Sequence, residues 1–190
     1  AGEIYFSGAI SLSANASIGG DVANNIVFFG PVTSNGHGLV LLDRISKLFV
    51  NANNTLSTIA SGPAVGGMNV TNNQALTIGQ VVLGGTSYRG IDSTGTVAVS
   101  TRTGNLTVSQ NVSTTSTSNN GNAPAIDLRA GTLTAAGTVT GGDLVLSGNP
   151  SFSMGANALA VFYSGNSATT EATALISQLS ANSPFEKVYN

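Results

Sequence analysis

The chain has 190 residues, a formal net charge of −2 and only 7% charged residues, whereas an ordinary soluble domain has about 25%. Six Lys and Arg residues are too few for a basic surface that binds nucleic acid, and the lack of cysteine excludes disulfides and thiolate metal sites. The low net charge argues against disorder. The longest apolar run, Leu39 to Leu42, is far shorter than the roughly 20 residues of a transmembrane helix.

Short segments of alternating apolar and polar residues recur along the chain, for example at residues 9–13, 74–78 and 105–109. This alternation predicts β-strands that bury one face. Gly-Gly and Asn-Gly pairs lie between the segments and favour tight corners, because both residue types accept positive φ. We therefore expect an all-β fold.

The first strands repeat at an offset of 22 residues. The positions Ile4, Phe6, Gly8 and Ile10 recur as Ile26, Phe28, Gly30 and Val32. A fixed period of about 20 to 50 residues is typical of proteins built from stacked coils. The pattern predicts a right-handed parallel β-helix, a solenoid, and the alternative is an antiparallel β-sandwich, which also has short alternating strands.

The segment Leu39 to Val50 fits either a helix or two adjoining strands, and we favour two strands around an unusual corner. Asparagines near predicted corners are expected to form hydrogen-bonded ladders from coil to coil; they are Asn24, Asn25, Asn72, Asn73, Asn119 and Asn120.

A second, looser repeat sets Ile91-Asp92 against Ile126-Asp127, at an offset of 35 residues. It predicts that Asp92 and Asp127 occupy equivalent positions at strand starts. Arg89 and Arg129 lie close to them in sequence, so we interpret both positions as structural ion pairs rather than as a catalytic pair of carboxylates.

Near the carboxyl end, Thr170 can cap a short helix that has Glu171 in its first turn and apolar residues at helical spacing. We therefore divide the chain into solenoid coils at residues 1–165 and a capping segment with a short helix at residues 166–190. Because the sequence opens at Ala1 without a leader peptide, we interpret it as a processed form or an excerpt.

Three features together resemble the filamentous-haemagglutinin-like exoproteins of Gram-negative two-partner secretion. They are the I-x-F-x-G pattern at 4–8 and 26–30, the strand starts Gly-Asn-Leu-Thr-Val at 104–108 and Gly-Asp-Leu-Val-Leu at 142–146, and the segment 158–165 before the predicted helix. The resemblance implies a long β-helical rod that is exported through an outer-membrane pore and is secreted or held at the cell surface. It also implies a role in adhesion or aggregation.

The sequence shows no catalytic motif. His37, the one histidine, lies in the segment Asn-Gly-His-Gly at 35–38, which is typical of a loop. The Gly141-Gly142-Asp143 segment lacks the spacing of a calcium-binding repeat. We predict a structural or adhesive segment that is not an enzyme and holds no cofactor and no metal. Its expected partners are neighbouring coils of the same or another subunit, which would build an oligomer or a filament. A second expected partner is a cell-surface or matrix receptor that the sequence does not identify.

Two alternatives stay open. Parallel β-helices also carry polysaccharide-active enzymes, which need clustered carboxylates, and the chain has eight Asp and Glu residues. An ice-binding solenoid would need Thr-x-Thr pairs on one flat face; such pairs occur at 101/103, 132/134 and 138/140.

Overall fold

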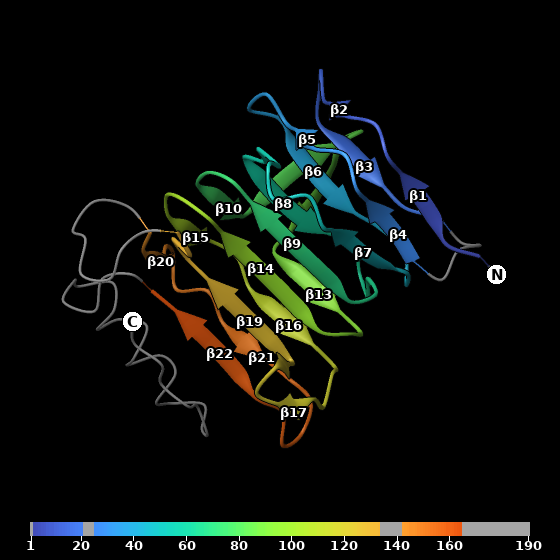
Figure 1. Ribbon diagram of the computed structural model, residues 1–190. Helices are drawn as coiled ribbons and strands as arrows, with labels where there is room; N and C mark the ends of the chain where they lie inside the picture. The colour runs from blue at the N-terminus through green and yellow to red at the C-terminus, as the bar shows by residue number, and fades with distance from the viewer. Residues whose placement is uncertain (1, 21–24, 134–141, 165–190) are drawn as a thin grey trace.

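The computed structural model describes residues 2–20, 25–133 and 142–164, and all regular secondary structure in these ranges is β-strand (Figure 1). Most strands belong to two large sheets. The seven-stranded sheet has the order β1 (Ile4–Phe6), β4 (Asn25–Phe28), β7 (Ser46–Phe49), β9 (Met68–Asn72), β14 (Val97–Thr101), β19 (Ile126–Arg129) and β22 (Ala160–Tyr163). The six-stranded sheet has the order β3 (Ala16–Ile18), β6 (Gly38–Leu41), β8 (Thr58–Ser61), β10 (Leu76–Ile78), β15 (Leu106–Val108) and β20 (Leu144–Leu146).

Smaller sheets lie between these two. One contains β13 (Ile91–Ser93), β16 (Val112–Thr114) and β21 (Phe152–Ser153), and another contains β2 (Ile10–Ser11) and β5 (Val32–Thr33). All pairings in these four sheets are parallel. The antiparallel pairings among the described residues are two hairpins, β11 (Gln80–Leu83) with β12 (Thr86–Arg89) and β17 (Asn119–Asn120) with β18 (Ala123–Pro124). An antiparallel β-sandwich is therefore the wrong alternative.

The chain passes through the sheets in the same order again and again. We call one passage from the seven-stranded sheet, through the six-stranded sheet and back, a circuit. The first circuit brings Ile4 beside Ile26 and Phe6 beside Phe28 in parallel pairing, and it brings Ile10 beside Val32. This register is the 22-residue offset of the sequence.

Later circuits differ in length. At one level of the seven-stranded sheet the pairs are Ile4–Ile26, Ile26–Lys47, Lys47–Met68, Met68–Val97, Val97–Ile126 and Ile126–Ala160. The two residues of each pair are thus 22 or 21 positions apart in sequence for the first three circuits, 29 for the next two and 34 for the last. The fourth circuit contains the β11–β12 hairpin, and the fifth contains the β17–β18 hairpin.

The core lies between the sheets, where alternate residues of each strand point inward. Along the seven-stranded sheet one inward row consists of Phe6, Phe28, Phe49, Val70, Val99, Leu128 and Phe162. Its first three rings stack, with centroids 5.0 Å apart between Phe6 and Phe28 and 4.5 Å apart between Phe28 and Phe49. Because neighbouring parallel strands are about 4.8 Å apart, the row puts each ring one strand above the next.

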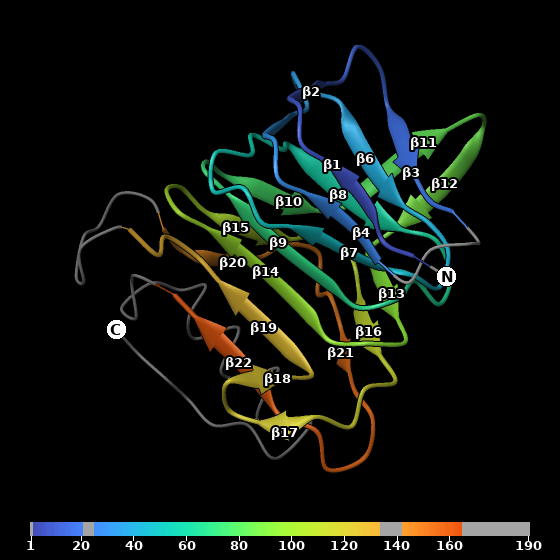
Figure 2. The same ribbon diagram turned by 45° about the vertical axis from the view of Figure 1, so that its right-hand side comes forward.

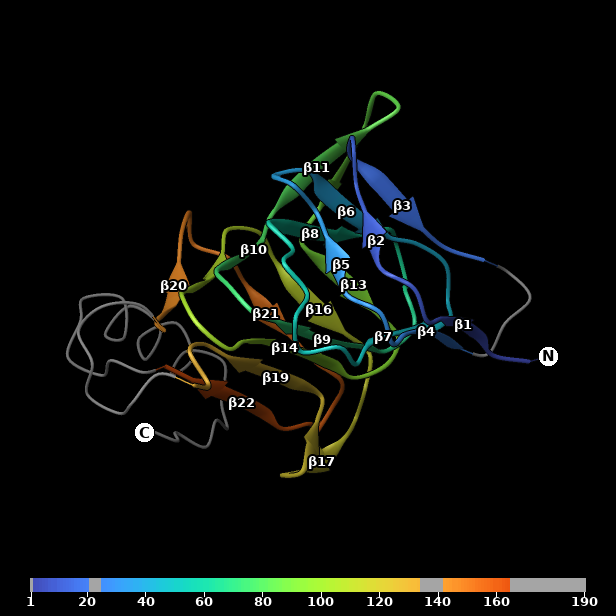
Figure 3. The same ribbon diagram turned by 45° about the horizontal axis from the view of Figure 1, so that its top comes forward.

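The segment 39–50 forms two strands, β6 and β7, joined at a corner, so the two-strand interpretation is correct. Asp43 takes a positive φ of 65° at this corner. The hairpin β11–β12 covers the outer side of the six-stranded sheet, where Val81 packs on Val40 and Ala60. Figure 2 shows this hairpin standing out beside β6 and β3, and Figure 3 shows β11 and β17 on opposite sides of the molecule.

The structural equivalence predicted from the second sequence repeat is wrong. Asp92 lies on β13 beside Ser113, whereas Asp127 lies on β19 beside Ala98, in a different sheet. The partner of Ile126 in the preceding circuit is Val97, not Ile91. The predicted helix near residues 170–180, the capping segment 166–190 and Asn24 lie outside the described residues.

Candidate functional site

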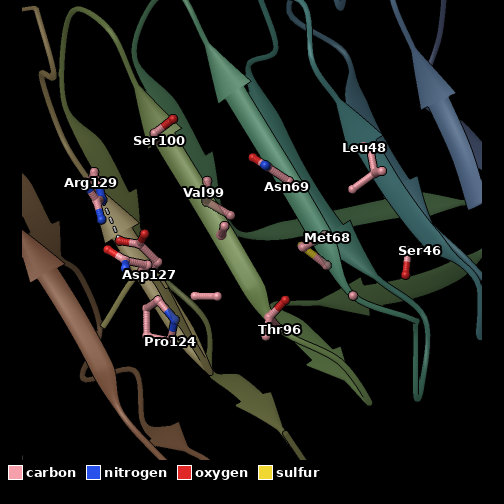
Figure 4. Close-up of a pocket in the computed structure, with 14 residues that line it drawn as sticks. Ser46, Leu48, Met68, Asn69, Thr96, Val99, Ser100, Pro124, Asp127 and Arg129 are labelled. Atoms are coloured by element: carbon pink, nitrogen blue, oxygen red, sulfur yellow. Dashed lines mark hydrogen bonds and ion pairs between the residues drawn. The ribbon is translucent and has the colours of Figure 1, made fainter. Parts of the chain in front are cut away.

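A hollow lies on the outer face of the seven-stranded sheet, over β7, β9, β14 and β19 (Figure 4). We call it the outer groove. Its volume is about 390 Å³, and its wall is formed by Asn122, Ala123 and Pro124 from the β17–β18 hairpin. The insertion that lengthens the fifth circuit therefore also encloses the groove.

Side chains from successive strands form the floor of the outer groove in rows. One row runs across four strands and consists of Leu48, Asn69, Ala98 and Asp127. The next row contains Ser100 and Arg129, which pair directly. The row before contains Ser46, Gly67 and Thr96. Gly67 has no side chain and Ala98 has only a methyl group, so two neighbouring rows of the floor each contain a small residue.

An ion pair stands at the β19 side of the groove. Arg129 Nε donates to Asp127 Oδ1 at 2.7 Å, and the two side chains lie on the same face because they are two residues apart on one strand. This hydrogen bond to Asp127 raises the pKa of Arg129. The side chain of Asp127 is 16% exposed and that of Arg129 is 42% exposed, so the pair is anchored at its base and open at its tip.

A second notable surface is the free edge of β1. Ile4, Tyr5 and Phe6 are 37%, 58% and 40% exposed, although Ile4 and Phe6 occupy the inward positions of the repeat. At the opposite end of the same sheet Ala160 and Phe162 are buried. Hydrogen bonds from Tyr5 and Asn25 lower the pKa of Glu3 beside this edge. We call Ile4, Tyr5 and Phe6 the open edge.

The glycines of the repeat lie side by side in this region. A Cβ atom added at Gly30 would overlap the backbone carbonyl of Gly8, whereas a Cβ at Gly8 would meet nothing within 4 Å. Gly30 thus makes room for the backbone of the preceding circuit at Gly8. The equivalent space beside Gly8 is not filled by any described residue.

The aspartates of the second repeat have different surroundings. Asp92 accepts hydrogen bonds from Ser113 Oγ and Ala64 N, both at 3.2 Å, while Arg89 lies on the β11–β12 hairpin opposite Gln80. Only Asp127 pairs with its arginine among the described residues. The structural ion pair predicted for both positions is therefore right at Asp127 and wrong at Asp92.

The other predicted candidates are scattered. His37 is half-buried in the turn after Asn35. Thr101 is buried and donates to Gly104 O, so it does not belong to an outward Thr-x-Thr face. Thr134, Thr138 and Thr140 lie outside the described residues, as does Gly141. The described Asp, Glu and His residues do not form a group of three that could hold a metal ion.

Buried polar side chains lie at two kinds of corner in the described chain, and the first of them was not anticipated. Lys47 occupies an inward position between Ile26 and Met68, and its Nζ donates to the carbonyl groups of Leu42, Asp43 and Ile45. Burial lowers the pKa of Lys47 to about 8, against the smaller opposing effect of Asp43. The corner at Asp43 therefore gathers three carbonyl groups around one ammonium group.

The second is a pair of asparagines at the corner after the seven-stranded sheet. Asn72 Oδ1 accepts from Leu56 N at 2.7 Å, and Asn54 Oδ1 accepts from Val32 N at 2.8 Å, so each amide bonds the backbone of the preceding circuit. The predicted ladder thus involves Asn72 and a residue that the sequence did not single out. Asn119 and Asn120 instead lie in an exposed hairpin strand.

Comparisons with protein-family models, with curated proteins and with solved structures gave no significant match. Within residues 2–20, 25–133 and 142–164, no helix has the length and apolar character needed to cross a bilayer.

Proposed function

We propose that the chain is a stretch of right-handed parallel β-helix and that it is a structural and adhesive segment of a secreted bacterial surface protein, with no catalytic role. The observation that carries the proposal is the repeated return of the chain to one seven-stranded sheet in parallel register, six times along one row of partners. Connections between parallel strands of one sheet are right-handed in about 98% of cases, which supports the proposed hand.

The outward side chains support a structural role. Most of those that the structure describes are small and neutral. Stacked circuits give a stiff rod because each one contacts only its neighbours. Such a rod holds binding surfaces away from the cell, and the resemblance to filamentous-haemagglutinin-like exoproteins points the same way.

The open edge supports a further part of the proposal, which is that another coil docks on β1. An unpaired strand edge presents free backbone donors and acceptors to a partner strand. Ile4 and Phe6 leave inward-type apolar surface uncovered there, and the open face of Phe6 continues the stack of Phe28 and Phe49. The partner that fits is a coil with the same I-x-F-x-G pattern, from the same polypeptide or from another subunit.

The docking can be tested by adding a coil. A second copy of residues 4–25, placed directly before Ile4, should pair with β1 at the 22-residue register and raise the melting temperature by several degrees, since a stacked repeat gains one more interface. Gly8→Ala should leave the original chain unchanged but remove this gain, because its Cβ would overlap the added coil as one at Gly30 would overlap Gly8. Arg89→Gln, on the exposed strand β12 and outside the open edge, is the control and should keep the gain.

An added coil that brings no stabilisation, or a gain that Gly8→Ala leaves intact, would contradict the docking. The adhesive part is tested separately by binding of the purified chain to immobilised cells and matrix proteins, where we expect saturable binding. Binding no greater than that of an unrelated β-rich protein of similar size would contradict adhesion.

A further inference from the structure

We propose that the outer groove is a binding site for a neutral oligosaccharide. The inference rests on the proposed adhesive function for its biological setting, and it names the class of ligand that this function leaves open. The volume of about 390 Å³ lies within the range of roughly 300–1,000 Å³ for small-molecule sites.

The Asp127–Arg129 pair offers a fixed acceptor beside a fixed donor. Asp127 uses Oδ1 for Arg129 Nε, and the described residues supply no hydrogen bond to Asp127 Oδ2 or to the terminal nitrogens of Arg129. A hydroxyl group has one donor and two acceptor positions, so adjacent sugar hydroxyls can donate to the carboxylate and accept from the guanidinium at the same time. Both hydrogen bonds are charge-assisted and therefore stronger than neutral ones.

The rest of the groove matches the same kind of ligand. Asn69, Thr96 and Ser100 add neutral donors and acceptors, while Leu48, Ala98 and Pro124 provide apolar surface for the C–H faces of a sugar ring. Figure 4 shows the side chains of Leu48, Asn69, Thr96, Ser100 and Pro124 around the hollow. A binding site that combines apolar lining with a few placed polar groups fixes both the position and the orientation of a small ligand.

Charge and topology disfavour other ligands. The lining contains one acid and one base, so its net charge is zero, and a polyanion would meet Asp127 without the several cations that phosphate or sulfate polymers need. An extended peptide binds a sheet by pairing with a free edge. The floor here consists of β7, β9, β14 and β19, which are already paired on both sides.

The test is binding of the purified chain to an array of defined oligosaccharides, followed by calorimetry with the glycans that bind. The neutral arms are linear oligomers of glucose, galactose, mannose and N-acetylglucosamine, and the anionic arms are oligogalacturonate and heparin fragments. We expect binding to one or more neutral oligomers. Asp127→Asn and Arg129→Gln should each weaken it at least tenfold, on the order of one charge-assisted hydrogen bond.

Ala98→Phe keeps every polar group but places a ring in the floor of the groove between Asn69 and Asp127, and it should abolish binding. Its side chain points outward, so circular dichroism and melting temperature should stay close to those of the parent. Arg89→Gln, on the exposed end of β12, is the control and should bind normally.

The proposal is overturned if the parent binds no neutral oligosaccharide at millimolar concentration, if it binds the anionic glycans more tightly, or if Ala98→Phe binds as well as the parent. Loss of glycan binding with intact attachment to cells would place adhesion on another face. Intact glycan binding without attachment to cells would instead contradict the adhesive function and leave this site in place.

Discussion

Phe28 and Phe49, which lie on neighbouring strands of the seven-stranded sheet, stack with ring centroids 4.5 Å apart and ring planes 12° apart. Phe28 also stacks on Phe6 and is only 1% exposed, so both of its faces are covered by other rings. One side chain thus ties three successive circuits together.

Replacing Phe28 by Ala should lower the free energy of unfolding by about 3–5 kcal/mol, because it removes a fully buried ring and leaves a cavity between two others. Phe29→Ala is the matched control, since the neighbouring ring is 53% exposed and its loss should cost under about 1 kcal/mol. Urea denaturation of the two variants measures the difference. Equal losses would contradict the assignment of Phe28 to the core.

Asn72→Ala should cost about 2 kcal/mol or more. The amide of Asn72 accepts from Leu56 N and donates to Leu56 O and Gln74 O, so its removal leaves buried backbone groups without partners. Asn73→Ala, one residue further along the chain, should change stability by about 0.5 kcal/mol at most. Thermal unfolding distinguishes the two, and a tolerated Asn72→Ala would show that the amide is not needed at this corner.

The buried Lys47 should make stability depend on pH in the alkaline range. Burial lowers the pKa of Lys47 to about 8 in the folded chain, and unfolding returns it to its ordinary value of 10.5. Between these values the unfolded chain binds more protons, so the free energy of unfolding rises with pH. We expect the urea midpoint of the parent, relative to that of Lys47→Met, to be higher at pH 10 than below about pH 8.

The comparison with Lys47→Met isolates this one group, because the other titrating residues are the same in both chains. The difference between the two midpoints should change across pH 8 to 10 and stay constant between pH 6 and 7. Parallel curves over the whole range would show that Lys47 keeps its ordinary pKa when folded.

Gly30→Ala should destabilise the chain by about 1–3 kcal/mol, because the new Cβ would overlap the carbonyl of Gly8 and neither backbone can move without disturbing the pairing of β1 with β4. Gly8→Ala, at the equivalent position one circuit earlier, should stay within about 0.5 kcal/mol of the parent. The two melting temperatures provide the measurement, and a reversed order would exclude the register derived from the repeat.

The first circuit could be predicted from sequence because nothing is inserted between Ile4 and Ile26. The all-β class and the parallel register of positions 4–10 with 26–32 follow from alternation and one offset. The match of Asp92 with Asp127 failed for the opposite reason. The partner of Asp92 is Ser113, 21 residues later, and the β17–β18 hairpin is inserted between Ser113 and Asp127, so two residues that look alike in sequence lie in different sheets.

The outer groove could not be found from sequence for a related reason. Its floor combines residues from four strands, and their alignment depends on the 21- and 29-residue separations that the repeat did not reveal. Only the ion pair of Asp127 with Arg129 was visible, because those two residues are neighbours on one strand. The inward Lys47 was hidden because its partners are backbone carbonyls, which leave no mark in the sequence.

The β11–β12 hairpin begins and ends at almost the same point. Gly90 N donates to Gly79 O at 2.9 Å, and Gln80 pairs with Arg89, so the hairpin closes on itself before the chain continues to β13. The two-residue tip at Gly84 and Gly85 is far from this closed base along both strands. The tip can therefore change in length and sequence without shifting any circuit, as long as Val81 keeps covering Val40 and Ala60, which makes the tip a place for displaying foreign peptides.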